Sequence, residues 1–150
     1  MTNSNYKTIA SKIKFEGRAF INGKYVDAID GEKFETINPA TGETLCSVAK
    51  CNSKDVDLAV KVSRKAFNSG VWSRTSPEFR KDVLLKFAEL LRSHGVENSV
   101  LECIDTGKLI GDCINEVAND APMHFQWYGE LIDKVFGKVG PTEPSLTSLI

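Results

Sequence analysis

The sequence lacks the features that would assign it at once to a membrane protein or a nucleic-acid-binding protein. Its 150 residues contain no apolar run near the roughly 18 residues that a membrane-spanning helix needs. Lys and Arg number 19 and Asp and Glu number 20, so the formal net charge is −1 and the basic excess of a nucleic-acid-binding domain is missing. We therefore expect no membrane contact and no nucleic-acid partner.

Secretory signals and metal-site spacings are also missing. The first 17 residues are polar and lack the apolar core and cleavage site of a secretory signal, so we expect a cytoplasmic protein whose cysteines are reduced. Cys46 and Cys51 lie five positions apart and Cys103 and Cys113 lie ten apart, whereas zinc sites favour close pairs such as C-x-x-C. Buried or half-exposed thiols are therefore favoured over a zinc site.

Common catalytic motifs are absent too. The sequence has no P-loop, no G-x-G-x-x-G fingerprint and no G-x-S-x-G elbow. The D-T-G triplet at 105–107 is typical of aspartic proteases, but those enzymes need two facing carboxylates and this triplet occurs once, at a predicted helix end. No cysteine is predicted beside a base or a helix N-terminus, so the residues alone reveal no active site.

What is present is a change along the chain from strands to helices. Asn22-Gly23 between short apolar runs predicts a β-hairpin over 19–27, because both residues tolerate positive φ. A second strand pair is predicted at Lys33–Ile37 and Thr44–Cys51, joined by a turn that contains Pro and Gly. Residues 146–150 are typical of a strand start, so we expect the chain to be a piece of a longer one.

Helical spacing of the apolar residues begins at Lys54. The first helix is predicted to be capped by Gly70, which tolerates the left-handed conformation of a helix C-cap. The second is predicted to start at Ser76-Pro77, an N-cap followed by proline at the first helical position, and to end at Gly95. A third is predicted from 96 to just before Thr106-Gly107, while residues 1–17 are open to a short helix or a disordered arm.

The region 110–136 is also helical in pattern, but it contains a proline. Pro122 would remove a backbone hydrogen bond and clash with the preceding turn of a regular helix. The sequence therefore predicts two helices, or one helix kinked at 119–122, with Asp120 as the N-cap of the second half.

Six segments, in order and spacing, resemble the N-terminal part of the aldehyde dehydrogenase superfamily over about residues 18–150. They are FINGKYV (20–26), INPATGE (37–43), KDVDLAVKVSRKAF (54–67), RKDVLLKFAELL (80–91) after Trp72, DTGK (105–108) and WYGELIDKVFGKV (127–139). The polar N-terminal arm and the last segment look most like the subgroup that oxidises γ-glutamyl-γ-aminobutyraldehyde in putrescine breakdown, with betaine aldehyde dehydrogenases as near neighbours.

The resemblance implies an oxidoreductase that converts aldehydes to carboxylic acids with NAD or NADP. In that family a cysteine thiolate attacks the carbonyl, hydride passes to the nicotinamide, and a glutamate activates water. Family members carry these residues and the cofactor contacts beyond the position of Ile150, and none of the four cysteines matches the nucleophile. We therefore expect this chain alone to be inactive and to hold no cofactor, and the full-length parent to be a homodimer or homotetramer acting on a small aldehyde.

The resemblance also implies the fold class, an α/β Rossmann-like cofactor domain. The chain would supply mainly helices, a hairpin and short strands, with most of the parallel sheet missing. Residues 1–17 would form a polar arm, 18–140 the N-terminal part of the NAD(P)-binding domain, and 141–150 the start of the segment leading to the oligomerisation domain. The helices would then expose their apolar faces for want of a partner surface.

Two groups of residues match functional positions of the family. Asp105 matches a position that binds a monovalent cation together with backbone carbonyls near Thr36 and Ile37; the alternative is an aspartate that caps backbone N–H groups at a helix end. Glu116 and Asp120 match the mouth of the substrate tunnel, where acidic residues suit a cationic substrate head. The alternative for this pair is a solvated helix face with an N-cap.

The sequence leaves two further readings of function open. The chain could be a truncated, non-catalytic product that acts only as an assembly or interaction piece, or an independent helical binding module with its own core. A reading frame that continues past codon 150 would favour the enzyme over the truncated product. A sharp cooperative denaturation curve of the 150-residue chain would favour the module.

Overall fold

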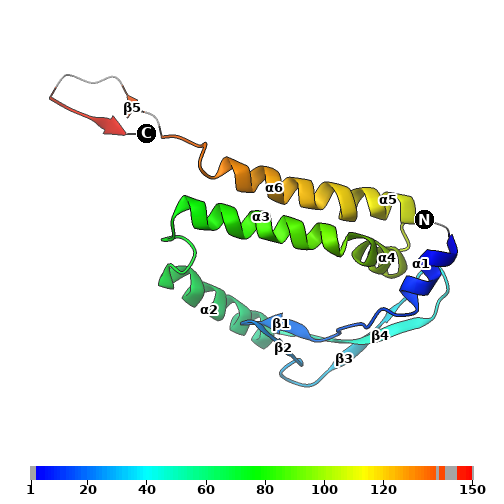
Figure 1. Cartoon of the computed structure of the whole chain (residues 1–150). Coiled ribbons are helices and arrows are strands. Elements are labelled where there is room, and N and C mark those ends of the chain that lie inside the picture. The colour runs from blue at the N-terminus through cyan, green and yellow to red at the C-terminus, as the bar shows by residue number, and fades with distance from the viewer. Residues whose placement is uncertain (1–2, 138, 141–144, 150) are drawn as a thin grey trace.

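The computed structural model describes residues 3–137, 139–140 and 145–149. Its elements in chain order are α1 (Asn3–Ala10), β1 (Ala19–Ile21), β2 (Lys24–Val26), β3 (Lys33–Ile37), β4 (Thr44–Ala49), α2 (Ser53–Ser69), α3 (Pro77–Ser93), α4 (Gly95–Thr106), α5 (Ile110–Cys113), the π-helix η1 (Ile114–Asp120), α6 (Ala121–Leu131), β5 (Val139–Gly140) and β6 (Ser148–Leu149). The described strands form three two-stranded antiparallel sheets, β1-β2, β3-β4 and β5-β6 (Figure 1).

Both predicted strand pairs are confirmed. Asn22 and Gly23 take positive φ values of 55° and 74° in the tight turn that pairs β1 with β2. Strand β4 ends at Ala49, two residues earlier than expected, and pairs with β3 through a register shift between Thr36 and Ile37. The N-terminal arm contains the helix α1, which packs against α4.

Helix α2 begins one residue before its predicted start, because of a cap that the sequence analysis did not identify. The Asn52 side chain accepts a hydrogen bond from the Lys54 N–H, while Asp55 Oδ2 accepts one from the Asn52 N–H at 2.8 Å, completing a capping box. Asp55 is 3% exposed, and its Oδ1 also accepts from the Ile29 N–H at 2.9 Å. This carboxylate therefore ties α2 to the chain that leaves the first hairpin. Gly70 caps the other end in the left-handed conformation, as expected.

Helices α3 and α6 run antiparallel and side by side (Figure 1). The Ser76 side chain caps α3 by accepting from the Phe79 N–H, and Pro77 occupies the first turn, as the sequence predicted. The helices approach closely because Gly129 has no side chain where a Cβ would lie 3.1 Å from the Leu84 Cβ. Lys81 and Asp133 pair at 2.8 Å, and this contact, with help from Lys134, lowers the pKa of Asp133 to about 2.

The second helix ends two residues before the predicted end at Gly95. Helix α3 ends at Ser93, and Gly95 is instead the first residue of α4. Gly95 is buried where α4 meets η1, and a Cβ built there would lie 2.8 Å from the Ala118 Cβ. The glycine is therefore used for close helix packing rather than for a C-cap.

Replacing Gly95 by Ala is expected to lower the free energy of unfolding by about 1–3 kcal/mol, because the new methyl group overlaps Ala118 in a packed contact. Gly111→Ala is the matched control: Gly111 is also helical but has nothing within 4 Å of a Cβ. That change should be neutral or stabilising by up to about 1 kcal/mol. Urea unfolding followed by circular dichroism measures both, and equal shifts for the two variants would contradict the role assigned to Gly95.

The interruption expected around Pro122 takes the form of a π-helix. Residues Ile114–Asp120 form η1, whose wider turn closes with a hydrogen bond from the Ala121 N–H to the Glu116 carbonyl. The helix thus continues into α6 while Pro122, which is fully buried, sits near the start of the next regular turn. The expected N-cap role of Asp120 is wrong: its φ of −75° and ψ of −43° are helical, and its side chain makes no capping hydrogen bond.

The chain buries little for its size. Its accessible surface is 11203 Å², whereas a compact monomer of this mass exposes about 7,600 Å². The buried apolar residues among those described are small: Ala28, Ala49, Ala88, Val100 and Cys113. Large apolar side chains remain exposed on α2, α3 and α6, as expected for helices that lack a partner surface.

Candidate functional site

The D-T-G-K segment lies where α4 ends and the chain turns into α5. On one side of it, Asp105 Oδ1 accepts a hydrogen bond from the Thr36 hydroxyl of β3 at 3.1 Å. The structure thus brings together two of the three residues expected at a cation site, from positions 69 apart in the sequence. The hydrogen-bond partner of the Asp105 carboxylate is thus a side chain of another element, which differs from the helix-cap alternative.

The third residue of this group, Ile37, follows Thr36 in β3. The register shift between Thr36 and Ile37 interrupts the regular strand ladder at the two residues whose carbonyls the family resemblance implies as ligands. A carboxylate, a hydroxyl and carbonyl oxygens are the donors that a hard cation prefers. Among the described residues, no group of three or more His, Cys, Asp or Glu side chains could hold a metal, so any cation here would depend on backbone oxygens.

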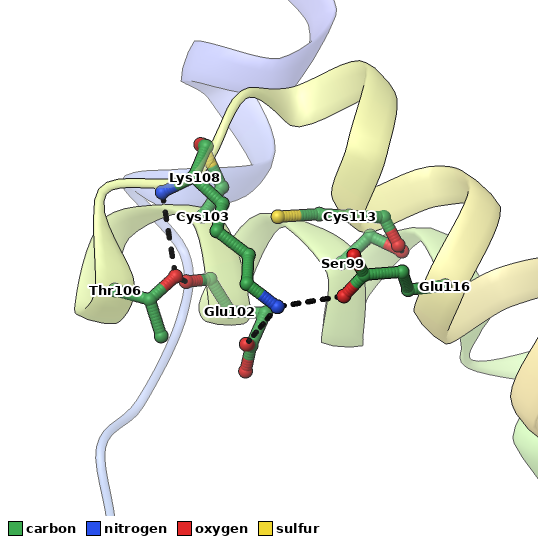
Figure 2. Close-up of polar contacts among 7 residues, drawn as sticks. All are labelled: Ser99, Glu102, Cys103, Thr106, Lys108, Cys113 and Glu116. Carbon is green, nitrogen blue, oxygen red and sulfur yellow. Dashed lines mark hydrogen bonds and ion pairs between the residues drawn. The ribbon is translucent and has the colours of Figure 1, made fainter.

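Lys108 lies between two carboxylates (Figure 2). Its Nζ is 2.6 Å from Glu116 Oε2 of η1 and 3.6 Å from Glu102 Oε1 of α4. The hydrogen bond from Lys108 to Glu116, followed by their charge attraction, raises the pKa of the lysine. No helical spacing links Lys108 to Glu116 across the loop, so the sequence pattern does not reveal this pair.

The structure makes the two predicted tunnel-mouth acids unequal. Both Glu116 and Asp120 lie in η1 and are exposed. Glu116 has its charge largely offset by Lys108, whereas the contact of Asp120 is made by its backbone carbonyl, which lies 2.8 Å from His124 Nδ1. The carboxylate of Asp120 is therefore the one with charge available to a cationic ligand.

The two cysteines at the junction of α4 and α5, Cys103 and Cys113, are not arranged as nucleophiles. All four cysteines of the chain are free. Cys103 donates its thiol hydrogen to the Lys108 carbonyl at 3.1 Å, and Cys113 is fully buried beside Ser99, so that burial raises the pKa of the Cys113 thiol. A catalytic thiol needs the opposite shift, toward the thiolate. The arrangement fits a packed junction between α4 and α5, not a reaction centre.

The comparison with known protein families decides the identity. The model of the aldehyde dehydrogenase family matches residues 25–150. This chain belongs to the aldehyde dehydrogenase family. The expected resemblance is thus confirmed, and so is the expected mixture of helices and short strands from the N-terminal part of the aldehyde dehydrogenase fold.

Three aldehyde dehydrogenases illustrate the relationship. The aminoacetaldehyde dehydrogenase of Pseudomonas aeruginosa is 37% identical over 150 residues, which are 100% of this chain and 30% of that protein. The NADP/NAD-dependent aldehyde dehydrogenase PuuC of Escherichia coli is 40% identical over 141 residues, 94% of this chain and 28% of PuuC. The structure of the γ-glutamyl-γ-aminobutyraldehyde dehydrogenase of Burkholderia cenocepacia matches with a TM-score of 0.95 and 41% identity, over 99% of this chain and 30% of that one.

The chain therefore spans about 30% of the length of these aldehyde dehydrogenases. None of the helices in the described ranges is long and apolar enough to cross a membrane.

Proposed function

We propose that these 150 residues serve an NAD(P)-dependent aldehyde dehydrogenase as the N-terminal part of its cofactor-binding domain. The reaction is the oxidation of an aldehyde, in particular an aminoaldehyde of putrescine breakdown, to a carboxylic acid. The observation that carries the proposal is the match to the aldehyde dehydrogenase family over residues 25–150, together with a fold shared with a γ-glutamyl-γ-aminobutyraldehyde dehydrogenase at a TM-score of 0.95. PuuC, to which the chain is 40% identical, is an NADP/NAD-dependent enzyme, and this supports NAD or NADP as the cofactor.

Within that enzyme this chain supplies structure rather than the reacting groups. Cys103 and Cys113 lie at the α4–α5 junction, Cys46 lies in β4, and Cys51 is exposed after β4. The nucleophile and the nicotinamide contacts thus belong to the longer polypeptide. In the proposed organisation, residues 1–17 form the N-terminal arm, 18–140 belong to the cofactor domain, and 141–150 lead toward the oligomerisation domain of a cytoplasmic homodimer or homotetramer.

The cation site is part of the same proposal. Thr36, Ile37 and Asp105 would hold a monovalent cation through carbonyl oxygens and one carboxylate. The 3.1 Å contact between Thr36 and Asp105 and the register shift at Ile37 support this placement. The bound cation would fix the end of α4 relative to β3, so its role would be structural.

Asp120 and Glu116 would favour a substrate with a cationic end. Because Lys108 offsets the charge of Glu116, most of the attraction would come from Asp120. At a partly exposed position one charge pair contributes about 1 kcal/mol after desolvation, or roughly fivefold to tenfold in affinity. This is a preference among aldehydes, not an exclusion.

A substrate comparison tests the proposed function. The enzyme is a single polypeptide in which this chain replaces the corresponding part of PuuC, and the double variant Glu116→Gln with Asp120→Asn removes the charges while keeping side-chain size. The variant should raise KM for 4-aminobutanal about fivefold to tenfold and leave pentanal nearly unchanged, and added salt should shrink the difference. Asp120→Asn alone should give most of the effect. Equal changes for both aldehydes, or none, would refute the tunnel-mouth assignment; no NADH formation from any aldehyde would refute the enzyme assignment.

A non-catalytic assembly piece is the second candidate. The large exposed apolar surface favours it, because such a surface needs a partner whether or not the assembly is an enzyme.

A further inference from the structure

Two carboxylates share the single positive charge of Lys108 (Figure 2). Its Nζ is 2.6 Å from Glu116 Oε2 and 3.6 Å from Glu102 Oε1. The three side chains together carry one positive and two negative charges, so the group is one cation short of neutrality. A monovalent cation that bound Glu116 would complete the group, provided that Lys108 moved to Glu102.

The backbone of Lys108 is fixed on both sides of the residue, whereas its side chain is exposed. The Lys108 N–H donates to the Thr106 hydroxyl at 3.4 Å, and the Lys108 carbonyl accepts from the Cys103 thiol at 3.1 Å. The side chain is 45% exposed. A lysine has a flexible four-carbon stem, so rotation about its bonds can exchange one carboxylate for the other while the backbone stays in place.

The ion pair between Lys108 and Glu116 is of a kind that another cation can replace. The side chain of Glu116 is 54% exposed and that of Glu102 is 36% exposed. Exposed ion pairs contribute little free energy, because water solvates the separated charges well. The hydrogen bond to Glu116 raises the pKa of Lys108, so the lysine is charged at neutral pH and competes with any other cation for this carboxylate.

We infer that Lys108 is a specificity-determining residue, which occupies the Glu116 carboxylate until the ammonium end of an aminoaldehyde displaces it toward Glu102. The inference rests on the proposed function, because that function places Glu116 at the mouth of the substrate tunnel. It goes further by giving Lys108 and Glu102 roles in substrate selection. Asp120 remains the main source of attraction before the exchange, and the exchange leaves two neutral ion pairs. An uncharged aldehyde leaves Lys108 on Glu116.

Removing the lysine charge tests the inference in the single polypeptide that joins this chain to the remainder of PuuC. Lys108→Met keeps a long side chain and vacates Glu116. The KM for 4-aminobutanal should fall about fivefold, the effect of one exposed charge pair, while kcat and the KM for pentanal stay nearly constant. Lys108→Arg retains the charge and should retain the original KM. Equal changes in the two KM values, or no change, would overturn the inference.

A second lysine provides the matched control. Lys86 forms an exposed ion pair with Glu89 on α3, with Nζ 2.8 Å from Oε2. Lys86→Met removes the same charge and the same kind of contact at a place away from η1, so both KM values should stay as they are. A fall in the KM for 4-aminobutanal as large as that of Lys108→Met would show a general charge effect and would refute the assignment to Lys108.

Two further variants distinguish exchange at Glu116 from simple repulsion between two cations. If Lys108 only repelled the substrate, Lys108→Met would lower the KM for 4-aminobutanal just as much after Glu116→Gln. Exchange predicts that most of the gain disappears in that background, because the vacated carboxylate is gone. Glu102→Gln alone should raise this KM, since the displaced Lys108 then lacks its second partner. A full gain that persists after Glu116→Gln would refute the exchange.

A binding measurement tests the inference without turnover. The n-butylammonium ion carries the cationic end of the substrate but no aldehyde, and 1-butanol is its uncharged counterpart. In an NMR titration, Lys108→Met should raise the affinity for n-butylammonium about fivefold and leave that for 1-butanol unchanged. Unchanged affinity for n-butylammonium would overturn the inference. Tighter binding without NADH from any aldehyde would uphold the role of Lys108 and refute the proposed enzyme, whereas turnover of 4-aminobutanal with a KM that ignores Lys108→Met would do the reverse.

Discussion

The purified 150-residue chain is expected to associate rather than to remain a 16.5 kDa monomer. The reason is the apolar surface of its helices, where Val60, Phe67, Phe79, Phe87 and Trp127 are 59%, 65%, 50%, 42% and 61% exposed. Patches of this extent on a soluble protein are uncommon without a partner. Multi-angle light scattering over a range of protein concentrations measures the effect, and the average mass should rise with concentration.

The physical cause can be separated from simple charge attraction. Sulfate strengthens apolar association, whereas salt screening weakens association between opposite charges. We therefore expect ammonium sulfate to increase the average mass, and a double change of Val60 and Phe67 to Asp to decrease it. A monodisperse monomer at high concentration would contradict the expectation and would favour the independent module.

A large loss of stability is also expected when Asp55 is replaced. Replacing it by Ala removes two hydrogen bonds to a buried carboxylate and leaves the N–H groups of Ile29 and Asn52 without their partner. The expected loss in the free energy of unfolding is about 2–4 kcal/mol, since charged hydrogen bonds and buried unpaired donors each contribute at this scale. The loss should be local as well, because α2 would separate from the chain after the first hairpin.

Asp57→Ala is the matched control for this change. Asp57 lies two residues further along α2 and is exposed, so its loss should change stability by no more than about 0.5 kcal/mol. Asp55→Asn should fall between the two, because its amide has one acceptor oxygen for two donors. Urea unfolding at one fixed, low protein concentration compares the three variants. Similar midpoints for Asp55→Ala and Asp57→Ala would contradict the structural role of the buried carboxylate.

The elements that the sequence predicted correctly depend on local chemistry. Asn22-Gly23 forms a turn because both residues accept positive φ, and Ser76-Pro77 starts a helix because a hydroxyl caps it and the proline needs no donor. Gly70 ends α2 for a similar local reason. In each case the information lies within a few residues, so a single sequence contains it.

The errors have two causes, a contact between distant residues and an unusual helical turn. Gly95 has the local pattern of a helix end, but its use is set by Ala118, which lies 23 positions away. Pro122 predicted a break, whereas the chain inserts a π turn before it, and Asp120 then has helical geometry instead of capping. Packing against a distant residue decides the use of Gly95, whereas the π turn is a local hydrogen-bond geometry that helix propensity does not encode.

In the candidate site, too, one contact was expected from the sequence and another was missed. Family resemblance placed Thr36 and Asp105 together, and the structure puts their side chains 3.1 Å apart. The pairing of Lys108 with Glu116 was missed because the loop after α4 sets it, not a helical period. Because Lys108 offsets the charge of Glu116, Asp120 is left as the main source of negative charge at the expected tunnel mouth.

The central claim is that this chain supplies the framework of an aldehyde dehydrogenase and not its reacting groups. The most direct measurement mixes the purified chain with NAD and a panel of aldehydes and follows NADH absorbance. The account predicts no turnover above background, because Cys103 donates its thiol hydrogen to the Lys108 carbonyl and burial raises the pKa of the Cys113 thiol. Turnover above background by the purified chain would contradict it, most directly if replacing Cys46, Cys51, Cys103 and Cys113 by Ser abolishes that turnover.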